Sequence, residues 1–591
     1  MVDTIPKRLF EQAKRAPERP AYLVKEGGVW KTTSWTGYAQ EVEQAARALI
    51  ALGFQPGQRV CILGFNRPEW VIMDLAAMAA GGAPAGIYTT CSPHEVQYIA
   101  HHSEAPLILV ENADQANKVF AERANLPELK HVVVMRGPKV EGAMSWEEFL
   151  ARGSSVATKE VHDRIDALEP NALATLIYTS GTTGPPKAVM LSHENLAWTA
   201  TVLRELTKIE AGGRSLSYLP LSHIAEQMVT IHGPITGGSA VYFAESIEKI
   251  ADNLKDARPT LFFGVPRIWE KFHSAIAGKL AGATGAKAKI AQWARGVGTQ
   301  VSALKNRGQE PTGMLALQYA LANRLVFSKL KEAIGLDQAT VMVTGAAPIA
   351  KEVVEFFASL DLIVQEVYGQ SEDSGPTTLN VPGRTKFGSV GPALPGVEVK
   401  IAEDDEILVR GKNVFLGYFK DEAATKETLD EQGYLHSGDL GKFDEEGFLH
   451  ITGRKKDIII TAGGKNITPK NIESGVKNHP AVGECVVIGD RRKFLSMVIS
   501  LDPEATPKWM EEHGESGAPH ESAALRASIQ QQIDEVNAKL ARVEQVKKFT
   551  ILSRPFGIDT GELTPTLKVK RNIVAKNFDK EIEAMYAGDK G

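Results

Sequence analysis

The sequence predicts an α/β protein: a large N-terminal domain of helix-covered sheets plus a small barrel-like element, followed by a small mobile α+β C-terminal domain. The chain has 591 residues, more than one hydrophobic core usually supports, so two or more domains are expected. Short β-branched runs alternate with helical patterns over the first three quarters, as in parallel sheets covered by helices. After about residue 386, short strands separated by turns replace this alternation, which indicates antiparallel pairing.

Five apolar, β-branched runs predict strands of the large domain. The helical period of residues 34–53 predicts an amphipathic helix between such strands. The Ala/Gly-rich window 71–88 carries Asp74, and it predicts a buried helix running into a strand instead of a membrane span. The predicted strands cover residues 59–65, 105–111, 131–137, 260–266 and 339–345.

The last third of the chain predicts a second unit. Short strands are expected within residues 396–419 and 441–453, and a charged, then glycine-rich stretch follows at 454–469. We therefore predict an N-terminal domain over residues 1–454 and a C-terminal domain over 455–591. The elements expected in the second domain are a helix at 471–480, strands at 484–490 and 497–502, and a long helix around 522–542.

Composition excludes several classes of protein. The chain is 43% apolar and 24% charged with a net charge of −5, which gives no reason to expect nucleic acid as a partner. Cys61, Cys91 and Cys485 are scattered without metal-ligand spacing, and such a sparse, odd set suits a reducing compartment. The N-terminus mixes charges and lacks the apolar core of a signal peptide, so a cytoplasmic protein is expected.

An apolar run ending at Tyr178 is followed by a loop of glycines and hydroxyl side chains, TSGTTGPPK. One interpretation is a hairpin whose hydroxyls bond their own backbone. The other is a phosphate loop, because glycines permit close ligand approach and N–H groups with hydroxyls can surround phosphate oxygens. A Walker loop is excluded, since Pro186 precedes the lysine and Ala188 follows it. The candidate residues are Thr179, Ser180, Gly181, Thr182, Thr183, Gly184 and Lys187.

The stretch TSGTTGPPKAV resembles the signature of the AMP-forming adenylate-forming enzymes, which include acyl- and aryl-CoA synthetases, luciferases and peptide-synthetase adenylation domains. The resemblance implies that this loop holds the β,γ-pyrophosphate of ATP while a carboxylate attacks the α-phosphate. It also implies that Thr179 contributes to catalysis and to a Mg²⁺ site. Several later segments extend the resemblance over nearly the whole chain.

Two short segments resemble the adenine and metal motifs of the same family. TGAAPIA (344–350) reads by itself as a helix-entry turn, but the resemblance implies that Gly345 and Ala346 meet the adenine edge. VYGQSED (367–373) reads by itself as a solvated acidic turn. The resemblance implies that its glutamate holds Mg²⁺ together with substrate phosphates, as Mg²⁺ is usually bound. The residues implied here are Tyr368 and Gly369 at the adenine, Ser371 at the α-phosphate and Glu372 at the metal.

The segment YLHSGDLGKFDEEGFLHITGRKKDIIITAGGKNITP (434–469) resembles the ribose-binding and hinge region of the family. The resemblance implies that Asp439 accepts hydrogen bonds from both ribose hydroxyls and that Arg454 contacts ribose or phosphate. Lys456 stands at the hinge position. Gly463 and Gly464 fit a loop that lines a tunnel for the pantetheine arm of CoA.

Near the C-terminus, LTPTLKVKR (563–571) resembles the closing lysine motif of the family, with Leu567 where glycine is usual. We assign the catalytic lysine to Lys568 in preference to Lys570. A lysine between the carboxylate and the α-phosphate would orient the nucleophile and stabilise developing charge. The simpler reading makes both lysines surface charges.

Residues 66–93, 217–228 and 262–272 resemble the long-chain fatty acyl-CoA synthetase branch, including its bubblegum-type members. The resemblance implies a ligase that uses ATP, Mg²⁺, CoA and a fatty acid. It also implies that the region from His223 to Gly345 builds the acyl pocket, and His223 is counted among the catalytic candidates. The preferred chain length and the oligomeric state are left open.

Three other functions fit parts of the sequence. A fatty acyl-AMP ligase would pass the acyl group to a carrier protein, and a non-catalytic acyl-binding homologue would keep only the fold. A P-loop ATPase is the weakest alternative, because the loop does not have the sequence of a Walker motif. The apolar segment 314–333, which has basic flanks, predicts a packed helix in preference to a membrane-surface element, so peripheral contact at the inner membrane face stays a hypothesis.

Overall fold

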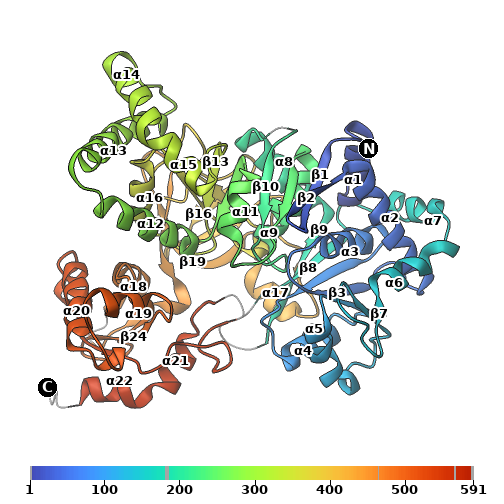
Figure 1. Ribbon diagram of the computed structural model, residues 1–591. Helices are drawn as coiled ribbons and strands as arrows, with labels where there is room; N and C mark the ends of the chain where they lie inside the picture. Colours follow the sequence, from blue (N-terminus) through green and yellow to red (C-terminus); the bar gives the residue numbers. More distant parts are fainter. Residues whose placement is uncertain (1–2, 180–184, 210, 463–464, 565–566, 588–591) are drawn as a thin grey trace.

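The computed structural model describes residues 3–179, 185–209, 211–462, 465–564 and 567–587 of the chain (Figure 1). Ser180, Gly181, Thr182, Thr183 and Gly184 of the predicted phosphate loop lie outside the described residues, as do Gly463 and Gly464. The roles assigned to these seven residues therefore stay predictions.

The largest sheet has eight strands in the order β18-β9-β8-β4-β3-β5-β6-β7. Its central strands run parallel, and β8 pairs antiparallel with β9. The strands predicted at 59–65, 105–111 and 131–137 are confirmed, each shorter than its apolar run. The strands are β3 (Arg59–Leu63), β4 (Ala83–Ile87), β5 (Leu107–Val110), β6 (His131–Val134), β7 (Met144–Ser145), β8 (Leu173–Thr179), β9 (Lys187–Ser192) and β18 (Gly417–Tyr418).

Helices cover both faces of this sheet, as the side chains of β3 demonstrate. Val60 and Ile62 enter one hydrophobic cluster, whereas Cys61 and Leu63 enter the other, because successive strand residues point to opposite faces. The first cluster contains α2 (Trp35–Ala51), α3 (Pro68–Ala79), α6 (Trp146–Arg152) and α7 (Thr158–Asp166). The second contains α4 (Pro93–His102) and α5 (Ala113–Ala121).

Two four-stranded sheets complete the helix-covered part, in the orders β10-β11-β1-β2 and β12-β13-β14-β15. In the second, Phe262 packs edge-on against Trp269, with ring centroids 5.4 Å apart. The strands are β1 (Pro20–Glu26), β2 (Val29–Ser34), β10 (Arg214–Ser217), β11 (Ala240–Phe243), β12 (Leu261–Gly264), β13 (Val341–Thr344), β14 (Val364–Tyr368) and β15 (Thr378–Leu379). The helices are α1 (Ile5–Arg15), α8 (His193–Thr207), α9 (Ile224–Gln227), α10 (Gly233–Gly237), α11 (Ile250–Ala257), α12 (Pro266–Ala281) and α16 (Lys351–Ala358).

The antiparallel strands predicted after residue 386 are confirmed by a sheet in the order β16-β17-β19-β20. In the pairing of β19 with β20, Asp439 lies opposite Arg454. The elements are β16 (Glu398–Ile401), β17 (Glu406–Arg410), α17 (Glu422–Thr428), β19 (Leu435–Phe443) and β20 (Leu449–Arg454).

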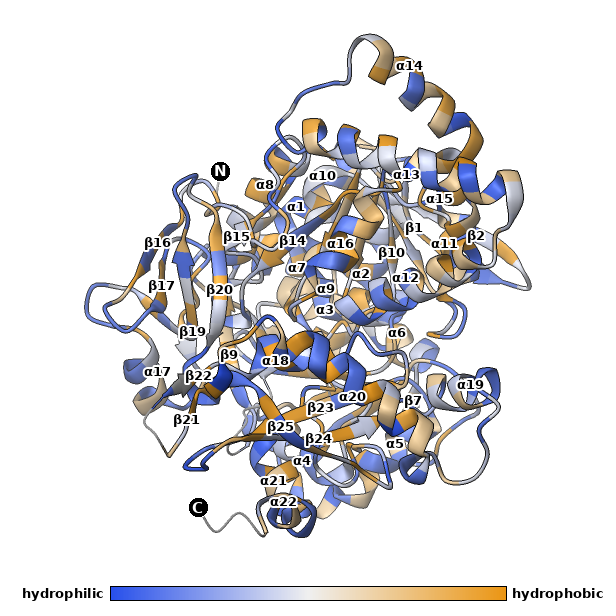
Figure 2. Cartoon of the chain, turned by 90° about the vertical axis from the view of Figure 1, so that its left-hand side faces the viewer, coloured by the Kyte–Doolittle hydropathy of each residue, from blue (hydrophilic) through white to orange (hydrophobic). Residues whose placement is uncertain are grey.

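The final elements form a smaller α+β unit with its own core, which confirms the predicted fold class (Figure 2). Its sheet has the order β23-β24-β25. Two ion pairs join it to α12 of the large part: Arg267 with Asp502 and Lys271 with Glu504, each 3.1 Å. The elements are β21 (Ile459–Ile460), β22 (Asn466–Ile467), α18 (Pro469–Val476), β23 (Val482–Ile488), β24 (Leu495–Leu501), α19 (Ala505–Glu512), α20 (Ala523–Asn537), β25 (Val546–Ile551), α21 (Arg571–Asn577) and α22 (Asp579–Tyr586).

A helical arm projects from the large part beyond α16: α13 (Gly285–Lys305), α14 (Gly313–Ala322), a short π-helical turn (Asn323–Phe327) and α15 (Ser328–Ile334) (Figure 1). The prediction of a packed helix over 314–333 is wrong for its outward face, because Met314, Leu317 and Leu321 are exposed. Asp361 anchors the arm. Its carboxylate accepts hydrogen bonds from the Nζ atoms of Lys305 (2.8 Å) and Lys331 (2.5 Å) and from the hydroxyl of Tyr319 (2.9 Å).

Within the described ranges, no helix combines the length and apolarity needed to cross a membrane. All three cysteines are buried free thiols.

Asp361→Asn tests the anchor of the arm. The buried carboxylate holds two lysines, so its neutralisation should lower the free energy of unfolding by about 3 kcal/mol. Asp361 has a φ of 61°, which asparagine tolerates, so the change adds no backbone strain. Thermal unfolding and hydrogen exchange of α13–α15 would measure the loss. The matched control is Asp163→Asn, which breaks an exposed pair with Lys159 and should change stability far less; equal effects would contradict the anchor.

Candidate functional site

The ends of β8 and β9 hold one side of the site. Thr179, the last residue of β8, lies opposite Lys187 at the start of β9, and its hydroxyl donates to the Lys187 carbonyl (3.4 Å). The Lys187 ammonium lies 4.8 Å from the centre of the Tyr418 ring. The Tyr418 hydroxyl donates to Oε1 of Glu372 (2.8 Å). One aromatic residue therefore fixes both the lysine of the predicted phosphate loop and the predicted metal-binding carboxylate.

A second carboxylate, Asp439, is held by three donors. Its Oδ2 accepts hydrogen bonds from the Tyr368 hydroxyl (3.0 Å) and from Nε2 of Gln370 (2.6 Å). Its Oδ1 lies 3.3 Å from Nε of Arg454, the cross-strand partner on β20. The structure thus brings together Tyr368, Asp439 and Arg454, which the sequence predicted separately. Sequence reasoning missed Gln370, although it lies inside the segment VYGQSED.

Close backbone packing explains two of the predicted glycines. A Cβ atom on Gly369 would lie 1.6 Å from the Gly375 carbonyl oxygen, and one on Gly345 would lie 2.4 Å from Cγ1 of Val367. Both distances are far inside van der Waals contact, so larger residues would move the backbone. The next residue, Ala346, has a φ of 65°, a strained conformation for a non-glycine residue. These three residues form a tight backbone wall beside Tyr368.

Lys568, in the C-terminal unit, forms a charged cluster with four other residues. It interacts electrostatically with Arg454, Lys470, Asp439 and Glu372. Desolvation by the surrounding protein lowers the pKa of Lys568, and the positive charges of Arg454 and Lys470 lower it further, whereas the two carboxylates oppose this shift. The residue is nevertheless accessible to solvent, so protein groups surround the ammonium without sealing it from water. Lys470, on α18, was missed because a lone lysine early in a helix reads as a surface charge.

The backbone around Lys568 forms a tight turn. Its N–H donates to the Thr564 hydroxyl (3.0 Å), and its carbonyl accepts from the Thr564 N–H (2.8 Å). Leu567 has a φ of 60°, in the left-handed region that favours glycine. This is the position at which the family usually has glycine, so the conformation fits the register that assigns Lys568. Lys570 begins the next helix as the N-cap of α21.

His223 connects the charged cluster to an apolar cavity. Its Nδ1 accepts a hydrogen bond from the Ala225 N–H (3.2 Å), so Nδ1 carries no proton. Burial lowers the pKa of His223 to about 4, and the positive charge of Lys568 contributes to the shift. The imidazole is therefore neutral at physiological pH. Its contribution to stability is lost as the pH falls from about 6.5 toward 4, because protonation then favours the unfolded chain.

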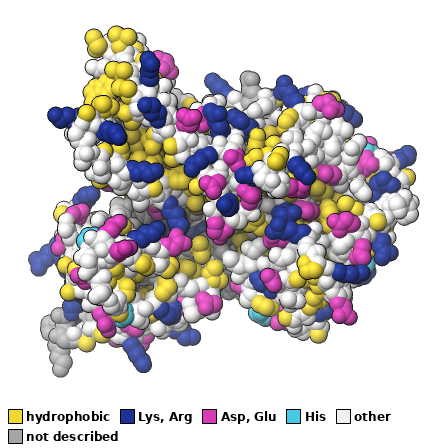
Figure 3. Space-filling model, viewed as in Figure 1, with side chains coloured by type: hydrophobic (Ala, Val, Ile, Leu, Met, Phe, Trp, Pro, Cys, Tyr) yellow, Lys and Arg dark blue, Asp and Glu magenta, His cyan; other side chains and the backbone are white. Residues whose placement is uncertain are grey.

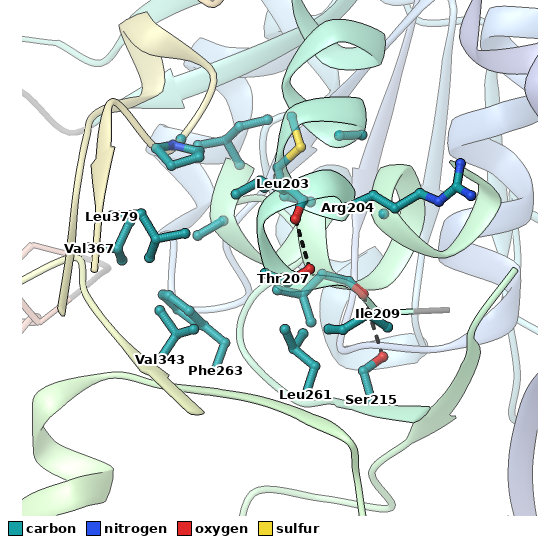
Figure 4. Close-up of a pocket in the computed structure, with 18 of the residues that line it drawn as sticks. Leu203, Arg204, Thr207, Ile209, Ser215, Leu261, Phe263, Val343, Val367 and Leu379 are labelled. Carbon is teal, nitrogen blue, oxygen red and sulfur yellow. Dashed lines mark hydrogen bonds between the residues drawn. The ribbon is translucent and has the colours of Figure 1, made fainter. Parts of the chain in front are cut away.

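The cavity has a volume of about 150 Å³ and is lined mainly by apolar side chains (Figure 4). One end meets the charged cluster at His223, Ala346 and Gly369, and α8 lines another part. The prediction that residues from His223 to Gly345 build this pocket was incomplete, because residues before and after that range also line it. The additional lining residues drawn in Figure 4 include Leu203, Thr207, Ile209, Val367 and Leu379.

A second cavity of about 410 Å³ lies around Asp361 and Lys331 and contains none of the predicted site residues. Among the residues that the structure describes, no group of three or more His, Cys, Asp or Glu side chains is arranged to hold a metal ion. A metal at Glu372 would therefore need ligands from a bound substrate.

Comparisons with known proteins fit this geometry. The family profile described as "AMP-binding enzyme" matches residues 9–419, and that described as "AMP-binding enzyme C-terminal domain" matches residues 456–590. The chain is 40% identical to the long-chain-fatty-acid–CoA ligase ACSBG2 of Xenopus laevis, over 99% of this chain and 84% of the relative. It is 36% identical to the long-chain-fatty-acid–CoA ligase FadD15 of Mycobacterium bovis, over 99% and 97%.

Among solved structures, the fold is similar to the adenylation domain of a carboxylate reductase from Mycobacterium chelonae. The TM-score is 0.75 at 21% identity, and the match covers 99% of this chain and 91% of that chain.

The pKa of His223 reports whether Lys568 occupies the site. Lys568→Ala removes a positive charge, so the pKa of His223 should rise from about 4, with burial still keeping it below its ordinary value. Histidine-selective NMR titration would measure this shift. Lys570→Ala is the matched control and should leave the pKa unchanged. A shift in the control, or none with Lys568→Ala, would contradict the assignment.

Proposed function

Because the chain belongs to the AMP-binding enzyme family, we propose that it is a long-chain fatty acid–CoA ligase. It converts ATP, a fatty acid and CoA into acyl-CoA, AMP and diphosphate through an acyl-adenylate. One observation carries this proposal: Lys568 meets Glu372, Asp439 and Arg454 beside the end of an apolar cavity. Charges for a nucleotide thus adjoin space for an acyl chain. The names of both relatives reported above support the same substrate class.

The nucleotide binds between the tight backbone wall and the Asp439 carboxylate. Gly345 and Ala346 approach the adenine edge, and the Tyr368 ring stacks on the base. Asp439, which three donors already hold in position, accepts from the ribose hydroxyls, and Arg454 lies beside it. Residues 179–184, Lys187 and Ser371 bind the phosphates. This pre-positioning lowers the entropy lost on binding.

In the first half-reaction, the fatty carboxylate attacks the α-phosphorus of ATP and diphosphate leaves. Lys568 screens the repulsion between these two anions and stabilises the negative charge on the transferring phosphate. Without ATP, desolvation disfavours the charged Lys568 ammonium, and Arg454 and Lys470 repel it; both effects lower its pKa. The charge of ATP offsets this repulsion, so nucleotide binding favours the arrangement in which Lys568 lies in the site.

Mg²⁺ fits the donors present at Glu372. Bound Mg²⁺ typically takes one or two carboxylates and completes its shell with phosphate and water oxygens. The Glu372 carboxylate and the Thr179 hydroxyl are hard oxygen donors that flank Lys187 and its loop. When bound there, Mg²⁺ would neutralise charge on the β- and γ-phosphates.

In the second half-reaction, the C-terminal domain (455–591) turns about a hinge near Lys456, relative to the adenylation domain (1–454). Lys568 then leaves the site, and the loop with Gly463 and Gly464 lines the path of the CoA thiol, which attacks the acyl-adenylate and releases AMP. Lys456 is exposed within a short turn between β20 and β21, a connection whose backbone angles can absorb a domain rotation. The exposed Arg267–Asp502 and Lys271–Glu504 pairs would break in this step at modest cost.

A cytoplasmic location with peripheral contact at the inner membrane face accompanies the proposed activity, because long-chain fatty acids partition into membranes. The oligomeric state is left open.

Release of AMP and diphosphate from ATP and Mg²⁺, with fatty acids of eight to eighteen carbons and with or without CoA, tests the proposed function. Turnover that requires CoA and peaks among the longer acids is expected. Adenylate made once and held regardless of CoA would instead indicate an acyl-AMP ligase. No acid-dependent diphosphate would refute both and leave a non-catalytic acyl-binding protein.

Thr207→Phe tests whether the cavity along α8 receives the acyl chain. The larger ring would exclude about two methylenes, which costs about 1.6 kcal/mol of burial. The kcat/KM for the longest acids should then fall roughly ten-fold, with little change for octanoate. Glu205→Phe places the same ring on the exposed side of α8 and should leave chain-length preference unchanged. Equal losses for short and long acids would contradict the assignment of this cavity.

A further inference from the structure

The outer face of the helical arm presents an apolar stripe to solvent. Met314, Leu317, Leu321 and Leu325 are 69%, 67%, 51% and 40% exposed. Their spacing of three, four and four residues places them on one side of α14 and the following π-helical turn. Figure 3 shows hydrophobic side chains gathered where α14 projects from the molecule. A run of exposed large apolar side chains on one helix face marks an interaction surface.

The arm holds this stripe in a fixed orientation. The inward side of α14 packs on α13 through Ala322, Phe327 and Val301, all of which are fully buried. Asp361 ties the end of α13, the middle of α14 and the middle of α15 to the large part. The opposite side of α14 is therefore directed outward by packing and ion pairs, and its exposure is a property of the fold.

The arm that carries the stripe is rich in positive charge. Residues 285–333 contain eight basic and two acidic residues, in a chain whose net charge is −5. Lys287, Lys289, Arg324 and Lys329 are exposed, and none forms an ion pair with any described residue. Figure 3 shows Lys and Arg side chains beside the apolar tip. An apolar helix face flanked by unpaired cations is the pattern of helices that lie in the surface of a bilayer.

We propose that the apolar stripe of α14 and its flanking cations dock on the surface of a bilayer that contains anionic phospholipids. The four apolar side chains enter the boundary between headgroups and acyl chains, and the lysines and arginines meet the headgroup charges. A second copy of the chain fits less well. A stable dimer usually buries about 800 Å² per partner, more than a stripe one side chain wide supplies, and a symmetric contact would bring like charges together.

Docking on a bilayer suits the proposed ligase activity, and the biological purpose of this docking rests on that proposed function. The acyl cavity is lined by α8, and the exposed Arg204 of that helix is among its lining residues. Figures 1 and 2 show α8 and α14 in the same upper half of the molecule from two directions. Docking through α14 would therefore hold that side of the protein toward the membrane, where long-chain fatty acids are concentrated.

Flotation with vesicles tests the proposal on the full chain. Wild-type protein should float with phosphatidylcholine vesicles that contain phosphatidylserine, and added salt should weaken this binding. The double variant Leu317→Gln, Leu321→Gln should lower the bound fraction at least ten-fold, and Lys287→Gln, Lys289→Gln should lower it several-fold. The matched control is Ile247→Gln, which removes an equally exposed apolar side chain (64%) outside the arm and should bind as wild type.

Absence of wild-type flotation, or equal flotation of the Leu317/Leu321 variant, would overturn the proposal. A wild-type dimer in sedimentation velocity that this variant dissociates would overturn it in favour of a second copy. Ligase turnover without vesicles, measured with dissolved fatty acids of eight to eighteen carbons, separates the two proposals. The variant should keep full turnover there, whereas failure of wild type to turn over with every acid would refute the ligase proposal alone.

Discussion

A charged contact between the two parts of the chain, the Lys568 ammonium beside Asp439 and Glu372, determines what the rest of the site can do. Arg454 and Lys470 surround the same ammonium, so the unliganded cluster holds three cations against two carboxylates. Such an arrangement favours a polyanion. It also makes the position of the C-terminal unit depend on the charge bound in the site, because Lys568 loses its main attraction once diphosphate leaves.

The apolar cavity and the charged cluster meet at His223, and this adjacency accounts for the chemistry. A buried, neutral imidazole can face an acyl chain without the cost of a buried charge, while Lys568 lies near enough to lower its pKa. The carboxylate of a fatty acid bound in the cavity would therefore lie at the end of the cavity next to the cations. The arm adds a third region, an exposed apolar stripe that we propose docks on a bilayer.

The sequence predicted the helices and strands well and singled out residues that the structure brings together, because both depend on local patterns. The runs at 59–65 and 105–111 became strands, and Asp439 with Arg454 became cross-strand partners. Features set by tertiary contacts were missed. Gln370 donates a hydrogen bond to Asp439, and α8 lines the cavity although it precedes the predicted pocket in sequence. The stripe of α14 reads as core, since periodicity reports a helix face but not what covers it.

The most direct test of the central contact separates the two half-reactions in Lys568→Ala. Acyl-adenylate formation from ATP and fatty acid should fall by about 100-fold, the usual loss on removing a group that stabilises transition-state charge. Thioester formation from preformed acyl-adenylate and CoA should stay within a few-fold of wild type, because Lys568 has left the site by then. Equal loss of both steps would contradict the proposed alternation and leave Lys568 with a structural role.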